Sequence, residues 1–166
     1  MRQESAIRSL QDLKGKRFAF GDPESTASHV VPSAMLRQAG VPESSLAETA
    51  FLNGHRNVAL AVLAGDFDAG AVKEEFFVEY APQGLRSLAH QPPVADHLFV
   101  ASTRLSGTEV DTLRRALEEL PATPAGKAAM IAIDPGMTAL VAARDSDYDN
   151  LRALMQLPAS APHPRR

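Results

Sequence analysis

Short apolar runs alternate with amphipathic stretches from the N-terminus to Ser102. Three of the runs have the length and composition of buried β-strands, and they cover residues 16–20, 47–52 and 67–72. Each is followed by a stretch whose apolar residues recur at helical spacing, over 28–38, 53–65 and 74–80. Further strands are predicted at 85–90 and 96–102. This alternation of strand and helix predicts an α/β fold with a mostly parallel sheet.

The pattern becomes mainly helical after Ser102. Residues 107–120 predict one amphipathic helix that begins at Thr108 as its N-cap and carries a stripe of leucines. Two more helices are predicted, one between the prolines of 121–137 and one within 145–157, which begins among acidic residues. The segment 158–166 is rich in proline and arginine and is expected to be a disordered tail.

Composition predicts a soluble globular protein and removes several classes of function. The chain has 166 residues, 45% hydrophobic and 22% charged, which is enough for one core of ordinary size or two small lobes. A net charge of -3 gives no electrostatic reason to expect nucleic acid or an anionic membrane as a partner. The absence of cysteine excludes disulfides, thiol catalysis and thiolate metal sites. No apolar stretch is long enough to span a bilayer, and the N-terminal MRQESAIRSL is too polar for a signal peptide.

The stretch between the first predicted strand and its helix has a distinctive chemistry. A Gly-Asp-Pro turn is followed by hydroxyl side chains at Ser25, Thr26 and Ser28, where the helix begins. Pro32 then falls in the first turn, where its missing N–H costs little. Backbone N–H groups at a helix N-terminus lack intrahelical partners and carry partial positive charge, which suits an anion. On local chemistry alone, ordinary N-capping by serine and threonine is the simpler explanation.

Four segments of the chain together resemble a known family of binding proteins. They read SLQDLKGKRFAFGDPESTASHVVPSAML, FLNGHRNVALAVLAGDFDAGAVKEEFF, PPVADHLFVAS and IDPGMTALVAARDSDYDNLR. From about Ile7 to Leu154 the chain resembles the PhnD-like phosphate- and phosphonate-binding proteins of bacterial ABC importers, within the type 2 periplasmic binding proteins. The resemblance implies a two-lobed clamp that closes on a ligand in the interlobe cleft. One lobe would be a three-layer αβα structure, and the second would be incomplete in this chain.

The resemblance also implies where the anionic end of the ligand binds. Ser25, Thr26, Ala27 and Ser28 match the family segment that binds phosphonate or phosphate oxygens through hydroxyls and helix-terminal amides. The family often has a third hydroxyl in place of Ala27 and a glycine in place of Ser28. One side-chain donor is therefore lost here, while the backbone amide of Ala27 remains.

Three other residues match family positions that face the ligand. His55 matches a histidine, Glu75 matches an acidic residue that takes a ligand amine, and Asp96 matches a carboxylate near the hinge. An anion site opposed by two carboxylates would suit a zwitterion such as an aminoalkylphosphonate, although bare phosphate or another anionic metabolite also fits. Without the resemblance, the simpler interpretation is that His55 is a surface histidine and that the two carboxylates are solvated acids. A shift of one residue would exchange Glu75 with Glu74.

The resemblance divides the chain into unequal parts. Residues 1–97 would form lobe two, 98–157 the returning C-terminal part of lobe one, and 158–166 the tail. Family members carry an upstream segment that supplies the first strands of lobe one. The chain is then either a piece of a longer protein or a truncated homologue that completes its sheet with a second copy, as a homodimer. The implied location is periplasmic, and the implied partner is an ABC permease.

The function predicted first is a solute-binding component of an ABC importer, without catalysis and without a cofactor. The alternative is a ligand-sensing domain of a signalling protein that uses the same fold. An enzyme is disfavoured because the sequence has no nucleophile elbow, P-loop, metal cluster or dinucleotide motif. The acidic spacing at 145–149 resembles a calcium loop but lacks the glycine and terminal glutamate of an EF-hand, so no metal site is predicted.

Overall fold

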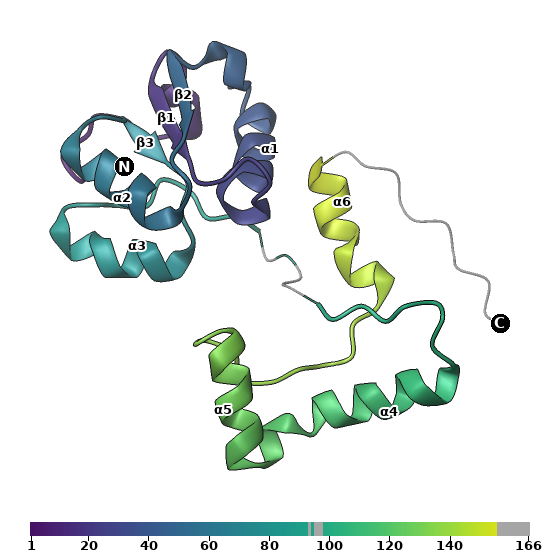
Figure 1. Ribbon diagram of the computed structural model, residues 1–166. Helices are drawn as coiled ribbons and strands as arrows, with labels where there is room; N and C mark the ends of the chain where they lie inside the picture. The colour runs from purple at the N-terminus through teal and green to yellow at the C-terminus, as the bar shows by residue number, and fades with distance from the viewer. Residues whose placement is uncertain (93, 95–97, 156–166) are drawn as a thin grey trace. The chain divides into compact units, whose positions relative to one another are not determined.

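The computed structural model describes residues 1–92, 94 and 98–155 (Figure 1). These residues fall into two compact units. The first unit contains the described residues of 1–94 and 150–155, and the second contains those of 98–149. Each unit has its own secondary structure and is described by itself below.

A three-stranded parallel sheet forms the centre of the first unit. Strand β1 (Arg17–Phe20) lies between β2 (Glu48–Phe51) and β3 (Ala69–Gly70), so the order is β2-β1-β3. The register pairs Phe20 with Phe51 and Ala19 with Gly70. The central strand is the most buried of the three, because both of its faces are covered, as is usual in parallel sheets.

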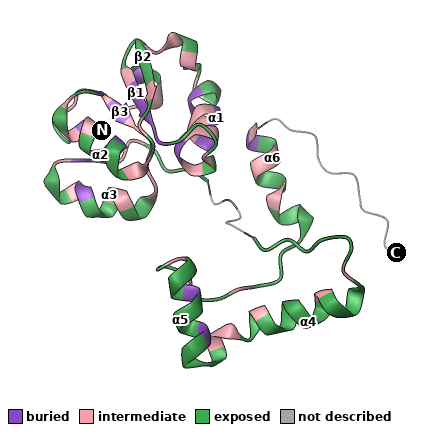
Figure 2. Ribbon diagram, in the orientation of Figure 1, coloured by how far each residue is buried: buried purple, intermediate pink, exposed green. Residues whose placement is uncertain are grey.

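Helices cover both faces of this sheet. On one face, Phe18 and Phe20 pack with the 3-10 helix Leu10–Leu13 and with α1 (Val31–Gln38). On the other face, Ala19 packs with α2 (His55–Ala64) and α3 (Glu74–Tyr80). Most of β1 is buried (Figure 2). Because successive side chains of a strand point to opposite faces, Phe18 and Phe20 belong to one core cluster and Ala19 to the other. The predicted α/β fold with a three-layer αβα arrangement is confirmed.

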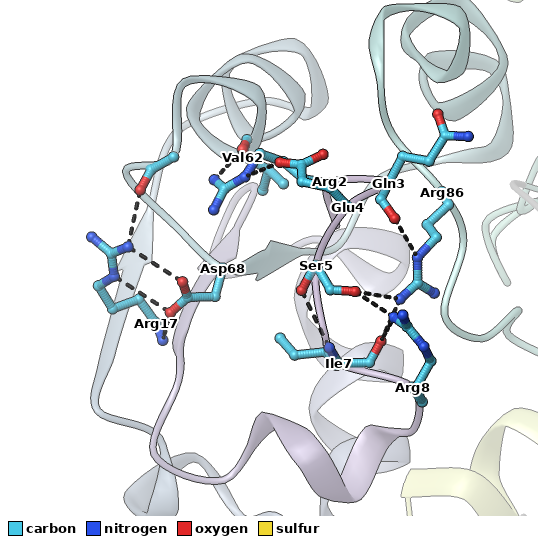
Figure 3. Close-up of polar contacts among 11 residues, drawn as sticks. Arg2, Gln3, Glu4, Ser5, Ile7, Arg8, Arg17, Val62, Asp68 and Arg86 are labelled. Carbon is cyan, nitrogen blue, oxygen red and sulfur yellow. Dashed lines mark hydrogen bonds and ion pairs between the residues drawn. The ribbon is translucent and has the colours of Figure 1, made fainter.

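The strand predicted at 85–90 is wrong, and so is the described part of the one predicted at 96–102. Among residues 85–92 and 98–102, the structure has only a single antiparallel bridge, from Leu85 to Arg2. The chain after Gly84 follows the N-terminal residues instead of the sheet, because the Arg86 N–H donates to the Met1 carbonyl at 2.9 Å. Figure 3 shows the Arg86 guanidinium donating to carbonyl oxygens of the same N-terminal segment.

The second unit consists of α4 (Gly107–Glu118), the 3-10 helices Leu120–Ala122 and Asp145–Tyr148, and α5 (Pro124–Ile133). Helix α4 begins after Ser106, not Thr108 as predicted. Ser106 forms a capping box with Glu109: its hydroxyl accepts from the Glu109 N–H at 3.3 Å, and the Glu109 carboxylate accepts from the Ser106 N–H at 2.8 Å. Glu109 favours Ser106 over Thr108 as the N-cap, because it lies three residues after Ser106 and can complete a capping box there.

Helix α6 (Asp149–Met155) packs within the first unit. Its Leu154 is buried with Val31 and Ala34 of α1. The sequence-based division placed 98–157 together, whereas the structure groups the end of that segment with the sheet. The assignment of 1–97 and 98–157 to two lobes stays a prediction. The predicted tail, 158–166, lies outside the described residues.

Asp68 binds Arg17, the first residue of the central strand, and we expect the loss of Asp68 to destabilise the first unit. Its carboxylate accepts from the Arg17 N–H at 2.9 Å and from the Arg17 guanidinium at 3.3 Å (Figure 3). Burial raises the pKa of Asp68, but hydrogen bonds and charge from Arg17 outweigh this and hold the pKa below its usual 3.8. Asp68→Asn should lower the free energy of unfolding by about 1 kcal/mol at neutral pH.

The pH dependence of this contribution follows from the lowered pKa. The unfolded chain binds a proton on Asp68 more readily than the folded chain, so the stabilisation is present above the ordinary pKa and is lost as pH falls through the folded value. Urea unfolding of Asp68→Asn beside Asp66→Asn, in neutral and acidic buffer, measures both effects. Equal stability of the two variants at neutral pH would contradict the expectation.

Candidate functional site

Three loops meet at the carboxyl edge of the sheet. Because the strands are parallel, the loops after β1, β2 and β3 all leave the sheet on the same side, where α/β proteins bind ligands. The Asn53 N–H donates to the Gly21 carbonyl at 2.7 Å, which joins the first loop to the second. The Lys73 N–H donates to His55 Nδ1 at 3.1 Å, which joins the second loop to the third.

The predicted ligand-binding residues within the described chain come from these three loops. Residues 25–28 follow β1, His55 follows β2 and Glu75 follows β3. They are separated along the sequence, and the sheet topology brings them to one edge. Asp96 lies outside the described residues. The assignment of all of them to a ligand site stays a prediction, which the geometry below develops.

Residues 21–28, called the cradle turn here, are held by their own polar groups. The Ser25 hydroxyl accepts from the Ser28 N–H at 3.1 Å and caps a π-helical turn, Thr26–Val30, which continues into α1. The Ser25 carbonyl accepts from the N–H groups of His29 and Val30 at 3.1 Å and 3.0 Å. The helix predicted from residue 28 thus begins two residues earlier, with a wider first turn. Such single π turns occur frequently at functional sites.

Two amides of the cradle turn remain unpaired. Among the described residues, none accepts a hydrogen bond from the backbone N–H of Thr26 or of Ala27. Thr26 is exposed and Ala27 is half-buried, so both positions lie near solvent. Unpaired amides at a helix N-terminus form a site of partial positive charge. The turn therefore offers two backbone donors and the Thr26 hydroxyl to an anion.

Ser28 has a different role from its neighbours. Its side chain is buried, with 1% of the residue exposed, and its hydroxyl accepts from the Asp22 N–H at 3.3 Å. It also packs against Gly21, where an added Cβ would lie 2.4 Å from the Ser28 hydroxyl oxygen. In this structure Ser28 shapes the turn from inside. Its place among the ligand contacts stays a prediction.

His55, the first residue of α2, is held as a neutral hydrogen-bond donor. Its Nδ1 accepts from the Lys73 N–H, so the hydrogen of the neutral ring is on Nε2. The ring stacks on Phe76 of α3, with centroids 5.2 Å apart and an interplanar angle of 23°. Burial and the charge of Lys73 lower the pKa of His55, and the charge of Glu75 partly offsets them. The Nε2–H group can therefore donate to an oxyanion without the ring first taking up a proton.

The lowered pKa of His55 predicts a loss of stability in mild acid. The unfolded chain binds a proton on His55 more readily than the folded chain. The contribution of His55 to the free energy of unfolding is therefore complete above its ordinary pKa of 6.5 and is lost as the pH falls through the lower pKa of the folded state. Thermal unfolding of the wild type and of His55→Asn between about pH 8 and pH 5 checks this. The variant, which cannot titrate there, should lose less stability than the wild type. Parallel curves for the two proteins would contradict it.

The two neighbouring glutamates of α3 have different surroundings. Glu74 lies 3.4 Å from a ring nitrogen of His90, and both side chains are exposed. Glu75 is also exposed, and its charge acts on His55. Of the two acids, Glu75 is the one whose charge acts on His55, and its assignment to the ligand stays a prediction. The two glutamates form a matched pair for experiments.

Sequence analysis missed three residues that shape this edge. Lys73 contributes through its backbone N–H, which no side-chain pattern reveals. Phe76 reads as an ordinary apolar position of a helix, although its ring orients His55. His29 contacts both the cradle turn and a segment further along the chain. A histidine one residue after the hydroxyl run was the available signal.

Two kinds of feature, metal-ligand clusters and membrane-spanning helices, are absent from the described residues. Among the described residues, no group of three or more histidine, aspartate or glutamate side chains could hold a metal ion. No helix formed by those residues is both long and apolar enough to cross a bilayer. The donors at the carboxyl edge are amides, a hydroxyl and an imidazole, groups that are able to donate hydrogen bonds to an oxyanion.

Comparison with known protein families shows to which family the chain belongs. Residues 1–148 match the family described as "ABC transporter, phosphonate, periplasmic substrate-binding protein". The chain belongs to this family. It is a family of substrate-binding proteins, not of enzymes, and the predicted absence of catalysis agrees with it.

Two curated relatives support the assignment to the phosphonate-binding family. The phosphate-import protein PhnD of Mycolicibacterium smegmatis is 27% identical over 180 residues, which cover 95% of this chain and 56% of that protein. A probable ABC transporter phosphite binding protein, PhnD1 of Prochlorococcus marinus, is 36% identical over 73 residues, 43% of this chain and 25% of that protein. The chain thus spans less than two thirds of the length of either relative.

Solved structures show the same fold in longer chains. PhnD1 of Prochlorococcus marinus, solved in complex with methylphosphonate, matches with a TM-score of 0.70 and 23% identity, covering 94% of this chain and 61% of that one. A Xanthomonas citri protein solved with bound ATP matches with a TM-score of 0.75 and 18% identity, covering 94% and 62%. At these identities the likeness establishes the type 2 periplasmic-binding-protein fold.

Proposed function

We propose that this chain binds a phosphonate- or phosphate-class anion as part of a solute-binding protein that delivers it to an ABC permease. One observation carries the proposal: the Thr26 and Ala27 amides are unpaired at the carboxyl edge of the sheet, beside the Thr26 hydroxyl. Phosphoryl oxygens are strong acceptors that carry negative charge, and helix-terminal amides suit them. The periplasm, where the family works, is the proposed location.

His55 would supply a further donor from the second loop. Its Nε2–H is available in the neutral ring, so anion binding would not depend on protonating the histidine. A tetrahedral oxyanion has enough oxygens to accept from the cradle turn and from His55 at once. The names of the related proteins mention phosphate, phosphite and methylphosphonate, and all three ligands are tetrahedral oxyanions.

Glu75 would select the other end of the ligand. A carboxylate near the imidazole suits an amine, and a ligand with an anionic and an ammonium end would satisfy both. This favours an aminoalkylphosphonate over bare phosphate. Asp96, which lies outside the described residues, would add a second carboxylate by the family resemblance.

Full closure around the ligand would involve more than this chain. The relatives are longer than this chain, and the family resemblance implies a ligand buried between two lobes. A single lobe leaves part of the ligand in water, so the chain alone should bind more weakly than a complete protein. The remaining surface would come from the rest of a longer protein or from a second copy of this chain.

Isothermal calorimetry with phosphate, methylphosphonate and 2-aminoethylphosphonate tests the proposal. Thr26→Val, which keeps the shape and removes the hydroxyl, should weaken binding of all three ligands by about tenfold. Glu75→Gln should weaken 2-aminoethylphosphonate selectively, because methylphosphonate has no amine. Glu74→Gln is the matched control and should change neither ligand. Unchanged affinities in both Thr26→Val and Glu75→Gln would overturn the assignment of the site.

A further inference from the structure

His29 lies where the cradle turn meets the sheet. Its half-buried ring packs edge-on against Phe20 and Phe51, with centroids 5.0 Å and 4.7 Å away. These phenylalanines are the last residues of β1 and β2 and face each other in register. Edge-on aromatic packing from two strands restricts the plane of the imidazole ring.

Two groups of His29 hold carbonyls near the free amides. Its Nδ1 lies 2.7 Å from the Pro23 carbonyl oxygen, and since a carbonyl can only accept, Nδ1 carries a hydrogen and donates it. The backbone N–H of His29 donates to the Ser25 carbonyl at 3.1 Å. Thr26 and Ala27 lie between these two carbonyls and His29 itself, so the bonds of one residue close the turn around the two free amides.

Glu43 connects the other ring nitrogen to a different element when both nitrogens carry a hydrogen, because a carboxylate oxygen only accepts. The Nε2 atom of His29 lies 3.3 Å from Glu43 Oε1, in the 3-10 helix Glu43–Ser45. The same oxygen accepts from the Ser33 hydroxyl of α1 at 2.5 Å. One carboxylate oxygen therefore connects the imidazole, α1 and the segment that leads into β2.

We propose that His29 is a positioning residue that holds the cradle turn in its binding conformation, with Glu43 fixing the orientation of the imidazole. This rests on the proposed function, because the turn matters for affinity only if Thr26 and Ala27 bind an anion. Both ring nitrogens of His29 are engaged, Nδ1 with the Pro23 carbonyl and Nε2 with the Glu43 carboxylate. The side chain therefore acts without touching the ligand. A turn ordered in advance avoids an entropy cost on binding, and a loosened turn incurs it.

Two substitutions of His29 separate the effect of its contact with Pro23 from the effect of its contact with Glu43. In His29→Asn the amide nitrogen can take the place of Nδ1 and still donate to Pro23, whereas in His29→Gln the amide reaches towards Glu43 instead. We expect His29→Asn to keep the affinity for inorganic phosphate within about twofold, and His29→Gln to weaken it by about three- to tenfold in calorimetry.

Hydrogen exchange without ligand gives a second readout on the same samples. The amides of Ser28, His29 and Val30 donate within the turn, so their protection reports whether the turn is closed. Protection should fall at these three amides in His29→Gln and be kept in His29→Asn. Thermal unfolding of both variants separates this local effect from a general loss of stability.

The outcomes distinguish this proposal from the proposed function. Equal protection in His29→Asn and His29→Gln would overturn it, because the Pro23 bond would then be irrelevant. If protection follows the expected pattern but the wild type binds neither phosphate nor methylphosphonate, the positioning of the turn is supported and the proposed function fails. Glu43→Ala covers the case in which His29→Gln does not fold: it should lower protection at the same amides, and unchanged protection would overturn the proposal.

Discussion

Gly21→Ala is expected to destabilise the first unit by about 1–3 kcal/mol and to weaken anion binding by at least about tenfold. A Cβ at Gly21 would lie 2.4 Å from the Ser28 hydroxyl oxygen and 2.7 Å from the Ser28 Cβ. Ser28 is buried and short, so it cannot swing aside without moving the backbone that carries Thr26 and Ala27. Thermal unfolding and phosphate calorimetry on the same sample measure the two effects.

A double-mutant cycle tests the steric cause. Ser28→Gly removes the two atoms with which the new Cβ would clash, at the cost of the bond from the Asp22 N–H. Gly21→Ala combined with Ser28→Gly should therefore be less destabilised than the sum of the single variants, by about 1 kcal/mol or more. Gly107→Ala is the control, since nothing lies within 4 Å of an added Cβ there. Additive effects in the cycle would show that the clash is not the cause.

The sequence predicted well those features that depend on neighbouring residues. Helix α3 was predicted at 74–80 and has these bounds, because a short apolar run and two glutamates in the first turn specify it locally. Gly65, predicted to end α2, adopts a φ of 87°, the left-handed conformation that favours glycine at a helix end. The order of strands and helices followed from the same periodicities, and so did the fold class.

The sequence predicted poorly those features that depend on distant partners. The segment after Gly84 has the composition of a strand, yet its neighbours are the N-terminal residues, with which Leu85 makes one bridge. The hydroxyls of Ser25 and Ser28 look equivalent in sequence, but contact with Gly21 and Asp22 buries the second. The tautomer of His55 is set by a backbone amide 18 residues away. Such contacts depend on the assembled sheet, so residue type and spacing do not reveal them.

The two nitrogens of His55 have separate tasks, and we expect substitutions to separate stability from affinity. The Nδ1 atom accepts from the Lys73 N–H, whereas Nε2–H is the proposed donor to the ligand. In His55→Asn the amide oxygen can still accept from Lys73, but the side chain is too short to replace Nε2. In His55→Gln the amide nitrogen can replace Nε2, but the bond from Lys73 is lost.

The expected ranking follows from which bond each variant keeps. Calorimetry should find phosphate binding about 10- to 100-fold weaker in His55→Asn and His55→Phe, because a hydrogen bond to a charged group is lost, and less weakened in His55→Gln. Thermal unfolding should rank the variants differently, with His55→Asn close to the wild type and the other two destabilised by the unpaired Lys73 amide. His55→Phe keeps an aromatic ring beside Phe76 and so controls for packing. If His55→Asn bound phosphate as tightly as the wild type, Nε2 would not contact the anion, and the site would be limited to the cradle turn.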